Sequence, residues 1–294
     1  MPLPLALCFG EILWDFLPEG LFPGGAPFNV GYHLHQQGVP TQLVSAVGDD
    51  VLGEELLRRL TGWGLGSELI ARRAQLRTGY VRATVGATGD AHYEIVADVA
   101  WDSIPATPEA LGAAARAGAL VFGSLAQRSP ANRSALARLL AALPAQAWRI
   151  FDVNRRPPHD DFTLVRSLAR GATVLKLNHE EAAWLAGEAL VPGGEERWAR
   201  QLASDFRCPY VVVTAGERGA GLWHEGRWHW ESGRVVAVVD TVGSGDAFLA
   251  SLVASLLEGT LSPPAALARA CRLGEWVASC RGATPPYSSL PPCT

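Results

Sequence analysis

The sequence has 294 residues, of which 48% are hydrophobic and 18% charged, and its formal net charge is −4. This balance is typical of a globular protein with a sizeable core and excludes a disordered chain. The slightly acidic charge provides no basic surface for nucleic acid, and charges or glycines interrupt the apolar runs before the roughly 18 residues that a membrane span needs. The five cysteines form no C-x-x-C pair, and the first ten residues lack a basic n-region. We therefore expect a cytoplasmic protein with reduced thiols.

Short apolar runs alternate with helical patterns along most of the chain. The predicted buried strands are Leu5–Phe9, Gln42–Val47, Leu120–Phe122, Trp148–Val153, Thr173–Leu177 and Tyr210–Thr214. The predicted helices are Pro27–Gln37, Gly53–Thr61, Pro108–Ala117, Ala131–Ala142, His179–Ala186, Glu195–Asp205, Ala247–Leu257 and Pro263–Ser279. This alternation predicts a mostly parallel sheet covered by helices on both faces. The proline-rich end, from Pro285 onwards, is expected to be a loose tail.

One segment departs from this alternation. Residues Thr78–Val96 alternate polar and apolar side chains around a Gly89-Asp90 turn, which predicts a β-hairpin. Together with Leu13–Leu17 it could form a small separate sheet. Such a sheet beside an α/β core indicates a lid or a dimer surface.

The most informative segment is the turn Asp240-Thr241-Val242-Gly243-Ser244-Gly245-Asp246, which follows an apolar, strand-like run at Val235–Val239. Glycines let the backbone approach a ligand closely, and the free N–H groups of a first helical turn attract anions. A carboxylate at the same place can take a proton from an attacking hydroxyl. The turn therefore indicates phosphoryl transfer. An ordinary helix start with a favourable acidic residue is the alternative interpretation.

Four more polar or glycine-rich clusters follow other predicted strands. They contain Asp15 with Gly24, Gly25 and Asn29; Asp152 with Asn154 and Arg156; Asn178 with Glu181; and Thr214 with Gly216 and Gly219. Taken singly, each can be explained as a turn, a solvated loop or a capping box. Because ligands bind beyond the carboxyl ends of parallel strands, five such clusters together predict one site. Lys176, the chain's only lysine, lies beside the third cluster.

The order of these clusters resembles the ribokinase (PfkB-type) carbohydrate kinases, especially the fructokinase-type members, over about residues 5–285. The most specific motif is the turn at 240–246, which is similar to the family's D-T-x-G-A-G-D. It departs at Ser244, where alanine is usual; serine is also small and supplies the same backbone N–H. The resemblance implies one domain over residues 1–294, with a ribokinase-like three-layer αβα sandwich and a mostly parallel central sheet. It also implies a small β-sheet lid formed by about residues 12–22 and 76–99.

The resemblance also implies roles for individual residues. Asp246 matches the catalytic base, and the backbone of Gly243, Ser244 and Gly245 matches the anion hole. The sugar-contacting positions are Asp15, Gly24, Gly25, Asn29, Asn154 and Arg156. The nucleotide-contacting positions are Asn178, Thr214, Gly216 and Gly219. The metal-linked positions are Glu181 for Mg²⁺, and Asp240 and Thr241 for a monovalent-cation loop completed near Gly282-Ala283.

The implied activity is ATP-dependent phosphorylation of a primary sugar hydroxyl, with fructose as the first candidate, Mg²⁺ as cofactor and K⁺ as an open option. Ribose, a nucleoside or 2-keto-3-deoxygluconate remain alternative substrates, and a non-catalytic sugar-binding regulator is a further alternative. The chain contains neither a G-x-x-x-x-G-K-[ST] loop nor a G-x-S-x-G elbow. Specificity is expected to depend on lid side chains, with Tyr80, Arg82, His92 and Tyr93 as candidates. Homodimerisation through the lid stays open.

Overall fold

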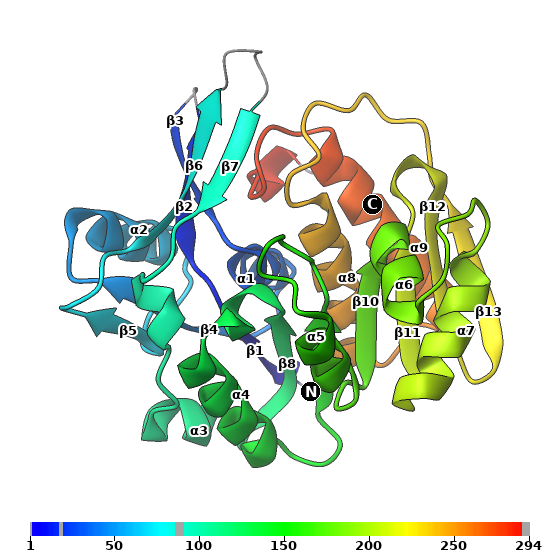
Figure 1. The fold of residues 1–294 in the computed structure, drawn as a ribbon, viewed down its shortest axis with the longest axis horizontal. Coiled ribbons are helices and arrows are strands. Elements are labelled where there is room, and N and C mark those ends of the chain that lie inside the picture. Colours follow the sequence, from blue (N-terminus) through cyan, green and yellow to red (C-terminus); the bar gives the residue numbers. More distant parts are fainter. Residues whose placement is uncertain (1, 18–19, 86–90, 290–294) are drawn as a thin grey trace.

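A computed structural model describes residues 2–17, 20–85 and 91–289 (Figure 1). Within these residues the large sheet has nine strands in the order β13-β12-β11-β10-β9-β8-β1-β4-β5. Their bounds are β1 Leu5–Phe9, β4 Thr41–Gly48, β5 Ile70–Arg73, β8 Ala117–Gly123, β9 Trp148–Asp152, β10 Val174–Asn178, β11 Tyr210–Thr214, β12 Gly219–His224 and β13 Arg227–Ser232. The strands from β5 to β11 pair in parallel, and β12 and β13 are antiparallel. The predicted, mostly parallel sheet is confirmed.

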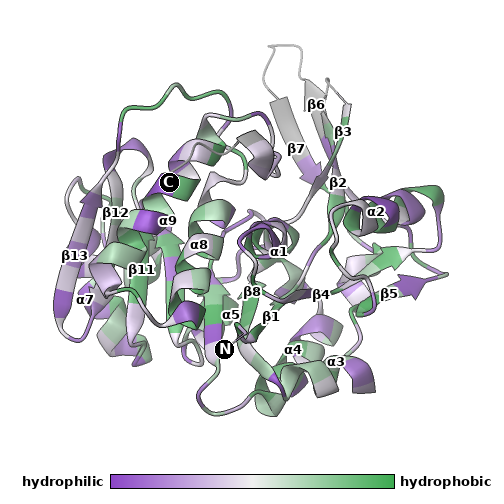
Figure 2. Ribbon diagram, turned by 180° about the vertical axis from the view of Figure 1, so that it is seen from behind, coloured by the Kyte–Doolittle hydropathy of each residue, from purple (hydrophilic) through white to green (hydrophobic). Residues whose placement is uncertain are grey.

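Helices cover both faces of this sheet. One face carries α1 (Ala26–Gln36), α2 (Val51–Gly62), α8 (Ser244–Glu258) and α9 (Pro263–Ala278). The other carries α3 (Pro108–Ala114), α4 (Pro130–Ala142), α5 (Phe162–Ala169), α6 (His179–Ala186) and α7 (Glu195–Phe206). Successive residues of β1 alternate between the two cores: Leu7 and Phe9 belong to one, Ala6 and Cys8 to the other. The period of two along a strand thus builds a three-layer sandwich, and Figure 2 shows the hydrophobic inner strands β8 and β11.

A second sheet stands away from the first (Figure 1). Its order is β3-β2-β6-β7, with β2 Leu13–Leu17, β3 Gly20–Gly24, β6 Gly79–Val85 and β7 Ala91–Ile95. The antiparallel pair β6–β7 confirms the predicted hairpin, and β2 joins it in parallel through β6. The Gly89-Asp90 turn lies outside the described residues. We call this four-stranded sheet the lid.

Most predicted elements are present, but the run Val235–Val239 is not a strand. It is an irregular segment between β13 and α8, in which Val235 and Val238 are exposed. Its β-branched residues favour extended backbone, yet it pairs with no strand in the described part of the chain; instead the N–H groups of Val239 and Asp240 donate to the Ala278 carbonyl at the end of α9, at 2.9 and 3.2 Å. The glycine-rich turn is therefore reached through a loop. Short elements that the sequence patterns did not predict are β3, β5, α5, β12 and β13.

The C-terminal segment is not a loose tail as far as it is described. The Tyr32 hydroxyl on α1 donates to the Pro285 carbonyl at 2.9 Å. The ring of Tyr287 packs against those of Tyr32, His33 and Trp276. For residues 285–289 the prediction was wrong, because proline content describes the chain locally, whereas aromatic packing against α1 and α9 holds this segment in place. Pro291 and Pro292 lie outside the described residues.

Within the described residues, no helix is long and apolar enough to cross a membrane. Cys8, Cys208 and Cys271 are buried free thiols, and Cys280 is a half-buried one. Cys293 lies outside the described part of the chain.

Candidate active site

A cavity of about 310 Å³ lies between the lid and the turn at the start of α8. It brings together residues from three of the five predicted clusters. The predicted residues that line it are Asp15, Gly25, Asn29, Asn154, Arg156, Thr241, Gly243, Gly245 and Asp246. The lining residues without a predicted role are Glu11, Leu13, Ala26, Val81, Ile95, Leu125, Lys176 and Val242.

The glycine-rich turn forms the N-terminus of α8. Gly243 caps the helix with φ of 77°, and a Cβ added there would lie 2.5 Å from the Cβ of Ala283. Glycine is needed because both the left-handed backbone and the close approach exclude a side chain. The N–H and hydroxyl of Ser244 both bond back to the Thr241 carbonyl, at 3.3 and 2.9 Å. The Ser244 hydroxyl is therefore already bonded within the turn. The N–H groups of Gly245 and Asp246 lie in the first turn of α8, where backbone N–H groups have no acceptor inside the helix.

Asp246 is held in place by a residue from α1. Its Oδ2 accepts a hydrogen bond from Asn29 Nδ2 at 2.8 Å, across 217 residues of sequence. Burial raises the pKa of Asp246 to about 6, with a further increase from the charge of Asp152 and a decrease from Lys176. The carboxylate is thus the main form at neutral pH, and it can accept a proton at the cavity wall.

Beneath the turn lies a buried ion pair that the sequence patterns did not predict. Lys176 Nζ is 3.0 Å from both carboxyl oxygens of Asp152, and both side chains are almost fully buried. A Cβ added to Gly245 would lie 3.3 Å from this ammonium. Burial lowers the pKa of Lys176, but the charges of Asp152, Glu181 and Asp246 outweigh it and hold the pKa above its usual value. Lys176 therefore brings a lasting positive charge to the cavity; its only sequence signal was a unique lysine near a strand end.

The N-terminal glycines permit close packing around Asp15. A Cβ on Gly24 would lie 2.2 Å from Asp15 Oδ2, and one on Gly25 would lie 2.4 Å from the Glu11 carbonyl oxygen. Burial raises the pKa of Asp15 to about 6, against the opposing charge of Arg156. Asp15 and Gly25 line the cavity, whereas Gly24 does not line it but packs against the Asp15 carboxyl group.

The register of the lid decides which of its side chains face the cavity. Val81 on β6 pairs with Ile95 on β7, and both line the cavity. Because side chains alternate along a strand, the neighbours of Val81 point to the opposite face. There Tyr80 packs on Phe16, and Arg82 forms an ion pair with Glu94. The two candidates Tyr80 and Arg82 were thus wrong, and the side chains of His92 and Tyr93 lie outside the described part.

The pair Asn178 and Glu181 forms a capping box at the start of α6. Asn178 Oδ1 accepts from the Glu181 N–H at 2.8 Å, and Glu181 Oε2 accepts from the Asn178 N–H at 2.9 Å. Glu181 Oε1 accepts from the Arg155 N–H at 2.7 Å. Burial raises the pKa of Glu181. The described residues contain no cluster of three or more His, Cys, Asp or Glu side chains that could hold a metal.

The predicted nucleotide positions lie one and two strands further along the sheet. Thr214, at the end of β11, is the register partner of Asn178 at the end of β10. Gly216 and Gly219 have φ of 61° and 116° and form the turn between β11 and β12. A Cβ on Gly219 would lie 2.0 Å from the carbonyl oxygen of Glu231. These residues do not line the cavity itself.

Asp240 ties the turn to the C-terminal segment. Its two carboxyl oxygens accept from the N–H groups of Val242 and Gly282, at 3.0 and 3.1 Å. The next residue, Ala283, offers its carbonyl to His33 Nε2 at 2.9 Å. Because a carbonyl can only accept, Nε2 carries the proton and Nδ1 accepts from the Tyr287 hydroxyl. Burial lowers the pKa of His33 to about 4, so the ring is neutral.

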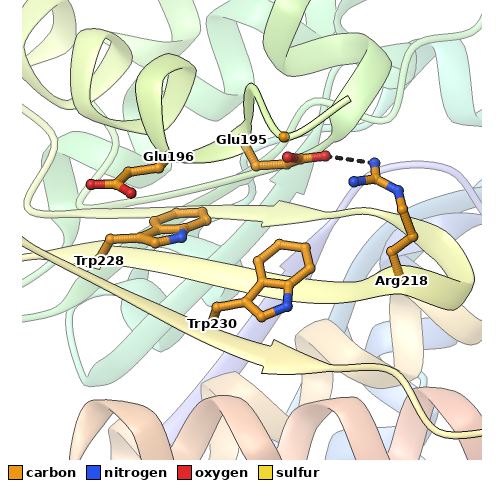
Figure 3. A pocket seen from close by; sticks show the side chains of 6 residues that line it. Glu195, Glu196, Arg218, Trp228 and Trp230 are labelled. Carbon is orange, nitrogen blue, oxygen red and sulfur yellow. Dashed lines mark ion pairs between the residues drawn. The ribbon is translucent and has the colours of Figure 1, made fainter. Parts of the chain in front are cut away.

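A second hollow, of about 220 Å³, lies between α7 and the edge strand β13 (Figure 3). Trp228 and Trp230 form one wall, and the buried carboxylate of Glu195 pairs with Arg218 at 2.5 Å. None of the predicted site residues lines this hollow. It holds the pair that joins α7 to the turn before β12.

The three-layer sandwich, with a β-sheet lid beside a carboxylate at a helix N-terminus, defines a ribokinase-like protein. The family model for "pfkB family carbohydrate kinase" matches residues 19–290. The chain therefore belongs to the pfkB family of carbohydrate kinases, and it is a sugar-phosphorylating enzyme of this family.

Similar proteins agree with this assignment. A fructokinase of Klebsiella pneumoniae is 29% identical over 93% of both chains. The crystal structure of a fructokinase with bound ATP from Xylella fastidiosa has a TM-score of 0.83 at 20% identity, covering 95% of this chain and 94% of that one. A fructokinase double mutant from Vibrio cholerae O395, with fructose, ADP and potassium bound, has a TM-score of 0.82 at 22% identity, covering 96% and 94%. At these identities the solved structures support the fold.

Proposed function

We propose that the protein transfers the γ-phosphoryl group of ATP to a primary hydroxyl of a neutral sugar, with fructose as the first candidate. One observation carries the proposal: Asp246 lines a sugar-sized cavity at the first turn of α8, where Asn29 fixes its carboxylate. The fructokinase relatives support fructose as the sugar.

In this mechanism Asp246 accepts the proton of the attacking hydroxyl. Asn29 orients the carboxylate, which leaves its other oxygen, Oδ1, for the sugar. The N–H groups of Gly245 and Asp246 stabilise negative charge on the transferred group, since they lie at the positive end of the helix dipole. Lys176 adds a fixed positive charge beside them. The apolar Val81 and Ile95 of the lid exclude water from the reacting hydroxyl.

The residues around Asn178 fit a nucleotide that is bound with its metal. Glu181 would order Mg²⁺ through water, because both its oxygens already accept backbone N–H groups. Bound Mg²⁺ neutralises phosphate charge. Thr214, Gly216 and Gly219 lie beside Asn178 and would contact the rest of the nucleotide. Asp240 and Thr241 would serve a monovalent cation through the backbone of the loop that Asp240 pins to Gly282.

The charge and size of the cavity favour a small neutral sugar over the alternatives. The carboxylates of Asp15 and Asp246 line the cavity, and of its two cations, Arg156 and Lys176, the latter is already paired with Asp152. A sugar acid such as 2-keto-3-deoxygluconate would bring a further negative charge. The volume of about 310 Å³ is at the small end for ligand sites, which fits a monosaccharide better than a nucleoside.

The test is an ADP-release assay with fructose, ribose, nucleosides and 2-keto-3-deoxygluconate. We expect the highest kcat/KM with fructose. Asp246→Asn should lose on the order of 10²–10⁴-fold in kcat while retaining sugar affinity. Asp205→Asn, an exposed site on α7, is the matched control and should behave as the wild type. Near-normal turnover in Asp246→Asn would refute the mechanism. Sugar binding without ADP release in the wild type would favour a regulator.

A further inference from the structure

Glu11 is a buried acid in the wall of the cavity, and the mechanism above does not use it. It lies between β1 and β2, is 3% exposed, and lines the cavity together with Asn29 and Asp246. In the described part of the chain its Oε2 has no hydrogen-bond partner. Unpaired buried polar atoms are rare because they cost free energy, so an unpaired oxygen at a ligand cavity points to the ligand as its partner.

Within the described part of the chain, no ion pair joins Glu11 to a cation. The charged groups facing the same cavity are Asp15 on β2, Arg156 after β9, Lys176 on β10 and Asp246 on α8. Lys176 is bound to Asp152, and the Arg156 guanidinium donates to a backbone carbonyl. Burial raises the pKa of Glu11 to about 7; the backbone N–H groups of Glu11 and Ala26 and the charge of Arg156 oppose this shift, and Asp246 adds to it. A sugar that displaces water from the cavity would disfavour the ionised form further.

We infer that Glu11 is a sugar-positioning residue that binds a substrate hydroxyl as a neutral carboxylic acid, an inference that rests on the sugar-kinase function proposed above. The neutral acid offers one O–H donor and one carbonyl acceptor, which match a hydroxyl on both sides. It also adds no further negative charge to a cavity that already contains Asp15 and Asp246, of which Asp246 must stay ionised to act as the base. Sugar binding then takes up a proton at Glu11, and sugar affinity falls as the pH rises above about 7.

The test measures fructose binding without ATP, by calorimetry at pH 6, 7 and 8.5. Glu11→Gln keeps the shape, a donor and an acceptor, but cannot ionise. Glu11→Leu removes both hydrogen-bonding atoms. Glu195→Gln is the matched control, because Glu195 is equally buried but lies in the separate hollow of Figure 3. Repeating each titration in two buffers of different ionisation enthalpy gives the number of protons taken up.

For the wild type we expect the Kd to rise by up to about tenfold per pH unit above pH 7, with proton uptake. Glu11→Gln should bind within about threefold of the wild type at pH 6, since it can form the same hydrogen bonds, and show neither effect. Glu11→Leu should bind on the order of 10–100-fold more weakly. Glu195→Gln should follow the wild type at every pH.

The inference is wrong if wild-type affinity is independent of pH, or if Glu11→Gln still takes up a proton. If Glu11→Leu does not fold, the proton count for Glu11→Gln decides alone. Failure of the proposed function looks different, because the wild type would then neither bind nor phosphorylate any sugar of the panel. If the wild type phosphorylates fructose normally, and Glu11→Gln shows the same pH dependence of fructose affinity and the same proton uptake as the wild type, only the role of Glu11 is overturned.

Discussion

In the buried pair of Lys176 and Asp152 each charge depends on the other, so removing one of them should destabilise the protein more than removing both. Lys176→Met removes the ammonium but leaves the Asp152 carboxylate, which is 3% exposed, without its cation. Removing one partner of a buried ion pair costs about 3–5 kcal/mol, a large share of the roughly 5–15 kcal/mol that stabilises a typical domain. Asp152→Asn leaves the ammonium unpaired and should cost a similar amount.

The double variant Lys176→Met/Asp152→Asn removes both charges and should be more stable than either single variant. Urea unfolding followed by tryptophan fluorescence measures this directly, since the chain has 10 tryptophans. The exposed pair Arg58–Glu55 on α2 is the matched control, and neutralising it should leave the unfolding midpoint unchanged. Additive losses from the two single variants, or single variants as stable as the wild type, would refute this reasoning, because the two charges would then not depend on each other.

Three further expectations concern the turn, the C-terminal segment and the base. Gly243→Ala should lose about 1–3 kcal/mol of stability, and kcat with it, because its φ of 77° and the contact with Ala283 exclude a Cβ; unfolding and steady-state kinetics measure both losses. His33 has its pKa lowered from 6.5 to about 4, so the unfolded chain takes up its proton first. Stability should therefore fall between pH 6.5 and 4 by on the order of 3 kcal/mol, and His33→Asn should flatten this slope in pH-dependent unfolding. Since the pKa of Asp246 is about 6, kcat/KM should decline below pH 6 as the base takes up a proton; a flat acid limb would contradict its role.

The sequence predicted elements well where an apolar pattern and a sheet partner agree. The bounds of β1 and β11 match the predicted ones, and both strands lie inside the large sheet. The run Val235–Val239 has the same pattern but forms no ladder, and its last N–H bonds to the Ala278 carbonyl of α9. The apolar pattern indicates which conformation a segment favours by itself, whereas a strand also has to pair with a neighbouring strand in the assembled sheet.

The individual contacts of the site depended on packing that no local pattern encodes. Asn29 was predicted to contact the sugar, but it also holds Asp246 from 217 residues away. The sequence offered Tyr80 and Arg82 among its candidate specificity residues without a register for the hairpin, and in the structure Val81 and Ile95 face the cavity instead. Glu11 and Lys176 lie beside predicted clusters but were given no role from the sequence, and their importance follows from what surrounds them.

The sequence by itself determined the class of fold, the family and the order of the motifs along the chain, because strand–helix alternation and glycine-rich turns are local properties of residue type. Only the tertiary structure decided which charges meet, which oxygens stay unpaired and which lid face is inside. Those outcomes depend on sheet order, strand register and burial, which set distances and local polarity between residues far apart in the chain. Asp246 shows both levels: its place at a helix start is local, but its raised pKa and its orientation come from Asn29, Asp152 and Lys176.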